Sequence, residues 1–129
     1  MNTAMVIDDS RAMRAILARM LRALGFDVVE AANGQEALDR LKHLRELPVV
    51  ALVDWNMPVM NGLDFVTSVR SREEWRNIAL MMVTTESEYS QIVRALAAGA
   101  HEYVIKPFTE EAIAEKLALL GIAPVRTLA

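Results

Sequence analysis

The chain has 129 residues, a formal net charge of −3, 53% hydrophobic residues and no cysteine. This length suits one domain, and the lack of cysteine excludes disulfides, thiolate zinc sites and cysteine nucleophiles. No apolar run approaches the ~20 residues of a membrane-spanning helix, and the N-terminus lacks the basic and apolar regions of a secretory signal. We therefore expect a cytoplasmic protein that does not enter a membrane.

The first half of the chain alternates between two hydrophobic periods. An apolar run at about residues 4–7 predicts a strand, and the apolar stripe from Met13 to Leu24 predicts a helix that Gly25 ends. A second strand is expected at about 26–29 and a second helix over about 34–44. The run 49–53 is apolar throughout, which is typical of a parallel strand buried on both faces.

The second half continues the alternation. It predicts a short helix at about 63–70, an apolar strand at about 78–83, a helix over about 87–98 that Gly99 ends, and a strand at 103–105. A last helix starts after Pro107 with Thr109 as its N-cap. We expect one domain over residues 1–122 and a C-terminal tail over 123–129. Five strands alternating with five helices predict an α/β fold, a doubly wound parallel sheet with helices on both faces.

Polar residues follow four of the predicted strands. Asp8 and Asp9 follow the first strand and Asp54 the third, while Thr84 and Lys106 follow the fourth and fifth. Each has an ordinary explanation by itself, as a helix cap, a turn residue or a solvated strand end. In a doubly wound sheet, however, ligands bind beyond the carboxyl ends of the strands. The sequence therefore predicts a functional site at this edge.

The chemistry of these side chains indicates phosphoryl transfer. Three neighbouring carboxylates repel one another unless a hard cation lies among them, and Mg²⁺ prefers oxygen ligands. Asp54 can act as the nucleophile and form an aspartyl phosphate. Phosphoryl transfer needs positioning and neutralised oxygen charge, which Mg²⁺ and Lys106 supply, and Thr84 can donate a hydrogen bond.

Five segments together resemble response-regulator receiver domains of two-component signalling systems. They are Met-Val-Ile-Asp-Asp-Ser at 5–10, Leu-Val-Asp-Trp-Asn-Met-Pro at 52–58, Gly62, Val83–Thr84 and Tyr-Val-Ile-Lys-Pro-Phe at 103–108. The resemblance covers about residues 3–121 and is strongest to the stand-alone chemotaxis regulators of the CheY group. It implies a flavodoxin-like, CheY-like sheet with strand order 2-1-3-4-5. Asn61 departs from the family, because many receivers of this type carry an acidic residue there.

The resemblance implies a role for each residue at the site. A histidine kinase would phosphorylate Asp54. Asp9, Asp54 and the backbone carbonyl of Asn56 would bind Mg²⁺ directly, and Asp8 would bind it through water. Such a receiver catalyses only its own phosphorylation and dephosphorylation, so we expect a signalling switch and not an enzyme.

The resemblance also implies how the signal is formed and lost. Lys106 and Thr84 would contact the phosphoryl group, and Thr84 with Tyr103 would form the switch. Asn56 and Glu86 would tune dephosphorylation, and their identities match the fast-hydrolysing chemotaxis type. Phosphorylation adds roughly −1.5 to −2 units of charge, which can bias two pre-existing arrangements of the loop after residue 83.

A downstream protein would dock on the face formed by the fourth helix, the fifth strand and the fifth helix. This face carries Tyr89, Ile92, Tyr103, Ile105 and Lys116. For Ile92 and Ile105, a docking role and a plain core role remain equally open. We expect a monomer or a weak dimer.

Two other functions remain alternatives, namely a phosphate shuttle or sink and the receiver of a longer regulator. An aspartate-nucleophile phosphatase needs a general acid where Asn56 stands, and a flavin module would have its phosphate repelled by Asp8 and Asp9. The arginines at 11, 14, 19 and 22 share one predicted helix and are interpreted as a solvated face, so we expect no nucleic-acid partner.

Overall fold

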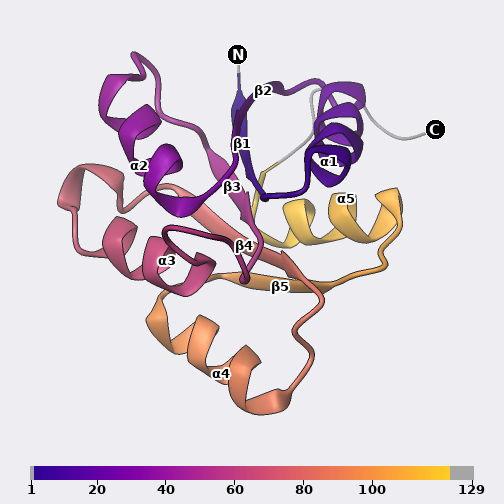
Figure 1. The fold of residues 1–129 in the computed structure, drawn as a ribbon. Helices are drawn as coiled ribbons and strands as arrows, with labels where there is room; N and C mark the ends of the chain where they lie inside the picture. The colour runs from indigo at the N-terminus through magenta and orange to yellow at the C-terminus, as the bar shows by residue number, and fades with distance from the viewer. Residues whose placement is uncertain (1, 123–129) are drawn as a thin grey trace.

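A computed structural model describes residues 2–122, so the tail predicted at 123–129 lies outside the described residues. The strands are β1 (Thr3–Ile7), β2 (Asp27–Ala31), β3 (Val50–Val53), β4 (Ala79–Thr84) and β5 (Glu102–Ile105). The helices are α1 (Arg11–Ala23), α2 (Gly34–His43), α3 (Gly62–Arg70), the short 3₁₀ helix η1 (Glu73–Trp75), α4 (Tyr89–Ala98) and α5 (Glu110–Leu119) (Figure 1). Strands and α-helices alternate as the sequence predicts.

The five strands form one parallel sheet in the order β2-β1-β3-β4-β5. The predicted fold class and strand order are therefore confirmed. Ile7, the last residue of β1, lies opposite Ala31 of β2 and Val53 of β3. This register brings the residues that follow β1 and β3 to the same edge of the sheet.

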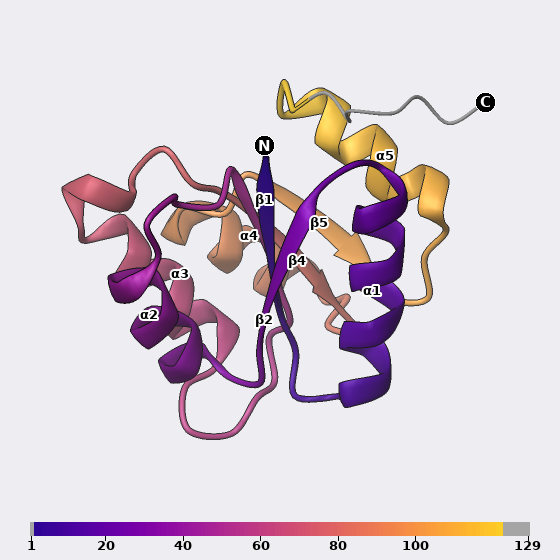
Figure 2. The ribbon, with the colours of Figure 1, turned by 90° about the horizontal axis from the view of Figure 1, so that it is seen from above.

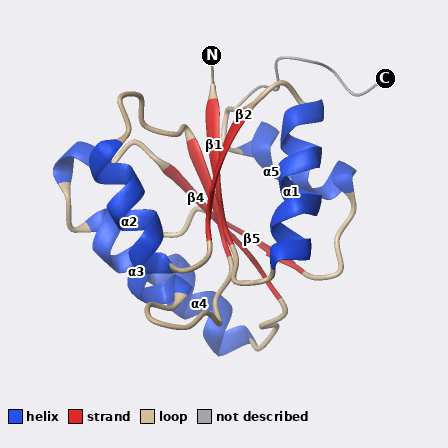
Figure 3. Cartoon of the chain, turned by 45° about the horizontal axis from the view of Figure 1, so that its top comes forward, coloured by secondary structure: helices blue, strands red, loops and turns tan. Residues whose placement is uncertain are grey.

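Helices cover both faces of the sheet and enclose two hydrophobic clusters. Figures 2 and 3 show α1 and α5 on one face and α2, α3 and α4 on the other. Met5 and Ile7 point to the α2–α4 face, whereas Ala4 and Val6 point to the α1–α5 face. Successive side chains of a strand alternate between faces, so a strand covered on both sides must be apolar throughout. This explains the unbroken apolar runs in β1 and β3.

Side-chain caps fix where α1, α2, α3 and α5 begin. Ser10, Asn33, Asn61 and Thr109 each accept a hydrogen bond from the backbone N–H three residues on. Such caps satisfy amide groups that have no partner within the helix. The cap at Ser10 begins α1 directly after the acidic pair, and the cap at Asn61 begins α3 just after the loop that carries Asp54.

The fourth helix differs from the sequence prediction. It begins at Tyr89 and not at about residue 87, and its buried residue is Ala95. Val93 and Leu96 from its apolar stripe are each 44% exposed. Ala95 belongs to the buried cluster on the α2–α4 face, while the larger residues beside it stay at the surface. The sequence did not predict helix η1. Within residues 2–122, no helix is long and apolar enough to cross a membrane.

Candidate functional site

Three carboxylates meet at the carboxyl ends of β1 and β3. Asp8, Asp9 and Asp54 each offer a carboxylate oxygen within 4.8 Å of the others. Asp8 is buried, Asp54 is partly buried and Asp9 is exposed, so the cluster opens to solvent on one side. Hard oxygen donors at this spacing suit a divalent cation such as Mg²⁺, which keeps several waters of its own. The predicted convergence of these three residues is confirmed.

Lys106 reaches this cluster from the end of β5. Its Nζ lies 2.8 Å from Asp8 Oδ2 and 3.5 Å from Asp54 Oδ2. The backbone N–H of Lys106 donates to the carbonyl of Thr84, so the strand pairing itself carries the side chain to the site. The Lys106–Pro107 peptide is cis. One ammonium thus neutralises part of the charge of two carboxylates.

The residues around Thr84 form a connected set of hydrogen bonds. Thr84 is fully buried, and its hydroxyl accepts from the Glu86 N–H at 3.3 Å. The Glu86 carboxylate accepts from Asn56 Nδ2 at 2.7 Å, and the Glu86 carbonyl accepts from the Tyr103 hydroxyl at 2.7 Å. The Tyr103 ring packs against the cluster on the α2–α4 face. Glu86 therefore links the loops after β3 and β4 to β5.

Burial sets the acidity of Asp54. It raises the pKa of this carboxyl above the ordinary 3.8, and the neighbouring Asp8 carboxylate raises it further. Three groups lower the pKa but leave a net rise, namely the Thr84 hydroxyl, the Lys106 ammonium and the Trp55 N–H. The Trp55 N–H donates to Asp54 Oδ1 at 2.8 Å. A bound divalent cation would favour the ionised form that acts as the nucleophile.

Two neighbours of Asp54 are fixed by packing. Trp55 is buried in the α2–α4 cluster, as expected for a packing residue. The N–H of Gly62 donates to the Trp55 carbonyl at 2.8 Å, and a Cβ at Gly62 would overlap the Asp54 carbonyl oxygen. A glycine at this position therefore allows α3 to start against the backbone of the loop that carries Asp54.

The residues expected on the docking face are unequally exposed. Tyr89 is 82% exposed and Ile105 is 43% exposed, which favours the docking interpretation for both. Ile92 and Tyr103 are partly buried. Lys116 is held by an ion pair of 3.2 Å with Glu102. The exposed part of this face is thus centred on α4 and the end of β5.

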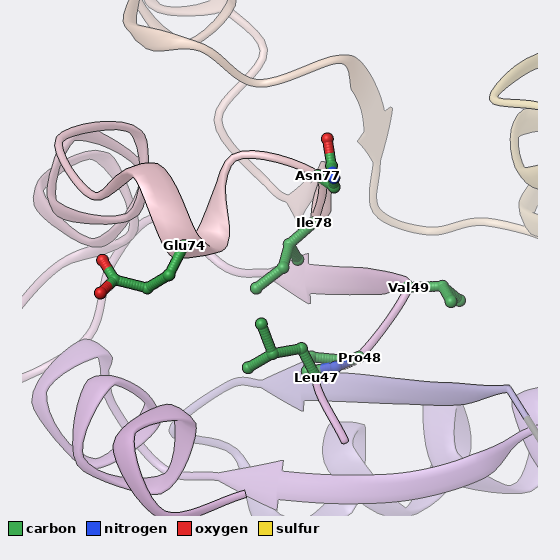
Figure 4. Close-up of a pocket in the computed structure, with 6 residues that line it drawn as sticks. All are labelled: Leu47, Pro48, Val49, Glu74, Asn77 and Ile78. Atoms are coloured by element: carbon green, nitrogen blue, oxygen red, sulfur yellow. The ribbon is translucent and has the colours of Figure 1, made fainter. Parts of the chain in front are cut away.

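A pocket of about 250 Å³ lies at the opposite edge of the sheet. It is lined by Leu47, Pro48, Val49, Glu74, Asn77 and Ile78, which precede β3 and β4. Figure 4 shows the side chains of Leu47 and Ile78 facing one another. Because these residues lie at the amino ends of the strands, the pocket does not belong to the acidic site.

A family model described as the response regulator receiver domain matches residues 4–118. The chain belongs to the response regulator receiver family. This receiver is 44% identical to the chemotaxis protein CheY1 of Helicobacter pylori over 88% of its own length and 91% of that protein. It is 43% identical to a CheY homologue of Campylobacter jejuni, over 88% and 87% of the two chains.

A solved structure supports the same assignment. The Vibrio cholerae chemotaxis protein CheY4 superimposes with a TM-score of 0.85 at 33% identity, covering 92% of this receiver and 98% of that chain. This receiver is a signalling domain of the two-component type, similar to chemotaxis regulators of the CheY group.

Proposed function

We propose that this receiver is a cytoplasmic CheY-type switch in which a histidine kinase phosphorylates Asp54 and a downstream chemotaxis protein reads the result. The observation that carries the proposal is the meeting of Asp8, Asp9 and Asp54 within 4.8 Å, with Lys106 Nζ at 3.5 Å from Asp54. The similarity to CheY proteins supports the chemotaxis assignment. The switch unit spans residues 1–122.

The cation site consists of Asp9, Asp54 and the Asn56 carbonyl, with Asp8 acting through water. Bound Mg²⁺ would neutralise the oxygens of the incoming phosphoryl group. One Asp54 oxygen forms the new P–O bond as the P–N bond to the kinase histidine breaks, and the released imidazole takes a proton from solvent. Lys106, already 2.8 Å from Asp8, turns its ammonium toward a phosphoryl oxygen. Catalysis is confined to this receiver's own phosphorylation and dephosphorylation.

The readout passes through Thr84 and Tyr103. A phosphoryl group on Asp54 accepts a hydrogen bond from the buried Thr84 hydroxyl and draws it toward the phosphate, and the Glu86 N–H, which donates to the same hydroxyl oxygen, is drawn with it. Since Glu86 also holds the Tyr103 hydroxyl, movement of this loop changes the position of Tyr103 and of α4. The exposed Tyr89 and Ile105 then present a different surface to the downstream protein. Asn56 and Glu86, joined to one another at 2.7 Å, control the access of water to the aspartyl phosphate.

Acetyl phosphate and Mg²⁺ test this proposal. Intact mass spectrometry should show the gain of one phosphoryl group, about 80 Da, only when Mg²⁺ is present. Asp54→Asn should gain none. A wild-type protein that gains no mass, or an Asp54→Asn variant that gains as much as wild type, would sink the proposal. Rapid loss of the added mass is expected for the chemotaxis type, and a stable adduct would favour a phosphate sink.

A further inference from the structure

We propose that Arg14 is a positioning residue for the cation site, because it holds the peptide that joins Asp8 to Asp9. Its Nη1 donates to the Asp8 carbonyl at 2.7 Å, and its Nε lies 3.4 Å from Glu30 Oε1 on β2. Its side chain is only 17% exposed. The inference rests on the cation-binding part of the proposed function and adds a residue to it.

Every other polar group of Asp8 is held by a different element. Its N–H donates to the Ala31 carbonyl at 3.1 Å, its Oδ1 accepts from the Ser10 N–H at 2.8 Å, and its Oδ2 pairs with Lys106. Arg14 binds the remaining atom, the carbonyl oxygen. Asp8 is thereby fixed on all sides, whereas the neighbouring Asp9 is exposed to solvent.

The planarity of the peptide transmits this hold to Asp9. A peptide bond keeps the carbonyl of one residue and the N–H and Cα of the next in one plane. Fixing the Asp8 carbonyl therefore restricts where the Asp9 backbone lies and where its carboxylate points. A ligand held in place before the metal arrives loses less conformational entropy on binding. Partners behind metal ligands commonly contribute to affinity in this way.

Glu30 keeps the guanidinium of Arg14 in the orientation that reaches Asp8. Arg14 lies on α1 and Glu30 lies on β2, so the ion pair joins two elements that flank the loop. The four arginines of the first helix were interpreted together as a solvated face. That interpretation is wrong for Arg14, because its guanidinium turns inward to this loop, while Arg11, Arg19 and Arg22 are exposed.

Positioning and simple charge predict opposite results for Arg14→Gln, which makes the inference testable. Removing the positive charge of Arg14 would by electrostatics alone strengthen cation binding, and removing the negative charge of Glu30 would weaken it. If Arg14 acts by positioning, both Arg14→Gln and Glu30→Gln weaken binding, although their charge changes are opposite. Arg19→Gln, on the exposed part of the same helix, is the control with the same change in net charge.

The experiment is a Mg²⁺ titration of the metal-free full chain, followed by Trp55 fluorescence in a Trp75→Phe background. We expect Arg14→Gln and Glu30→Gln each to raise the Kd for Mg²⁺ about 10-fold. Arg14→Lys should raise the Kd less, since an ammonium can still donate to the Asp8 carbonyl. The Kd of Arg19→Gln should match that of wild type. At saturating Mg²⁺, phosphorylation by acetyl phosphate should return close to the wild-type rate in all variants.

Several outcomes would overturn the positioning role. Tighter or unchanged binding in Arg14→Gln with weaker binding in Glu30→Gln would show that charge alone acts. An equal loss of Mg²⁺ affinity in Arg14→Lys and Arg14→Gln would show a general structural role. A phosphorylation defect that saturating Mg²⁺ does not repair would show the same. If wild type binds Mg²⁺ yet accepts no phosphoryl group, the proposed function fails while the titration still decides the role of Arg14.

Discussion

Asp54 is less acidic than an ordinary aspartate because it is partly buried beside Asp8. A raised pKa in the folded state means that the protonated form of this residue favours folding. Its contribution to the free energy of unfolding is complete below the unfolded-state pKa near 3.8, and it is lost as the pH rises through the folded-state pKa. At neutral pH the ionised carboxylate therefore destabilises the metal-free fold.

We expect Asp54→Asn to stabilise the metal-free protein at pH 7 by on the order of 1 kcal/mol. Lys106 keeps its partner Asp8 in this variant, so no cation is left without a partner. Urea denaturation in EDTA across pH 3.5 to 7.5 checks this prediction. The advantage of the variant should shrink as the pH approaches 4, and equal stabilities at pH 7 would contradict the origin given for the pKa shift.

Val59 has a backbone conformation that its side chain disfavours. Its φ is +69°, and 82% of the residue is exposed, in the loop between Asp54 and α3. A β-branched residue in the left-handed region is strained, whereas asparagine adopts this region more readily. The loop thus stores strain close to Asp54.

Val59→Asn should stabilise the fold by about 1 kcal/mol, because it relieves this strain without removing a buried contact. Val59→Ala is the control, since alanine keeps a Cβ but lacks the branch and the polar group. Thermal unfolding of the three proteins measures the difference. A melting temperature for Val59→Asn at or below that of wild type would show that the loop is not strained there.

At the scale of elements, Arg70 joins α3 to the amino ends of β4 and β5. Its guanidinium donates to the carbonyls of Gly99, Arg76 and Ile78. His101 lies beside it. The Nδ1 atom of His101 lies 3.2 Å from Arg70 Nη2 and accepts a hydrogen bond from the Leu80 N–H at 3.0 Å. Burial and the Arg70 charge lower the pKa of His101, and Glu102 opposes them in part. Protonation of His101 would remove the acceptor that Leu80 uses.

A lowered pKa gives His101 a stabilising contribution that is present above its unfolded value of 6.5 and is lost as pH falls through the folded pKa. His101→Asn can still accept from Leu80 through its amide oxygen, and it does not titrate. We expect this variant to lose less stability than wild type between pH 7 and pH 5, measured by urea denaturation. His43→Asn, on the exposed side of α2, is the control, and a pH profile for His101→Asn identical to wild type would refute the link.

The sequence predicted the elements better than it predicted the contacts between them. Asp8, Asp54 and Lys106 could be placed at one edge because they follow strands of one parallel sheet, and strand ends follow from hydrophobic periodicity. The links from Arg14 to Asp8 and from Asn56 to Glu86 could not be predicted, since they depend on how far side chains reach between elements. The buried face of α4 could not be identified from the sequence, because apolar residues cover more than one face of this helix.

At the scale of the whole molecule, the acidic site should couple cation binding to stability. A ligand that binds only the folded state stabilises it by about 2.7 kcal/mol at 100 times its Kd. Mg²⁺ should therefore raise the melting temperature of wild type by several degrees, and Asp54→Asn, which lacks one of the proposed ligands, should respond less. Differential scanning calorimetry with Mg²⁺ or EDTA tests this prediction, and an equal response of both proteins would show that Asp54 is not a ligand.

The strand order has a consequence for the growing chain during synthesis. The interior strand β1 leaves the ribosome first, and β2 and β3 both pair with it. Next, β4 adds to β3 and β5 adds to β4. Each new strand thus meets a neighbour that has already been made, so the sheet can assemble outward in the order of translation. Lys106, at the end of the last strand, is the final one of the strand-end residues to reach the acidic cluster, so the site is completed only when translation of this domain is nearly over.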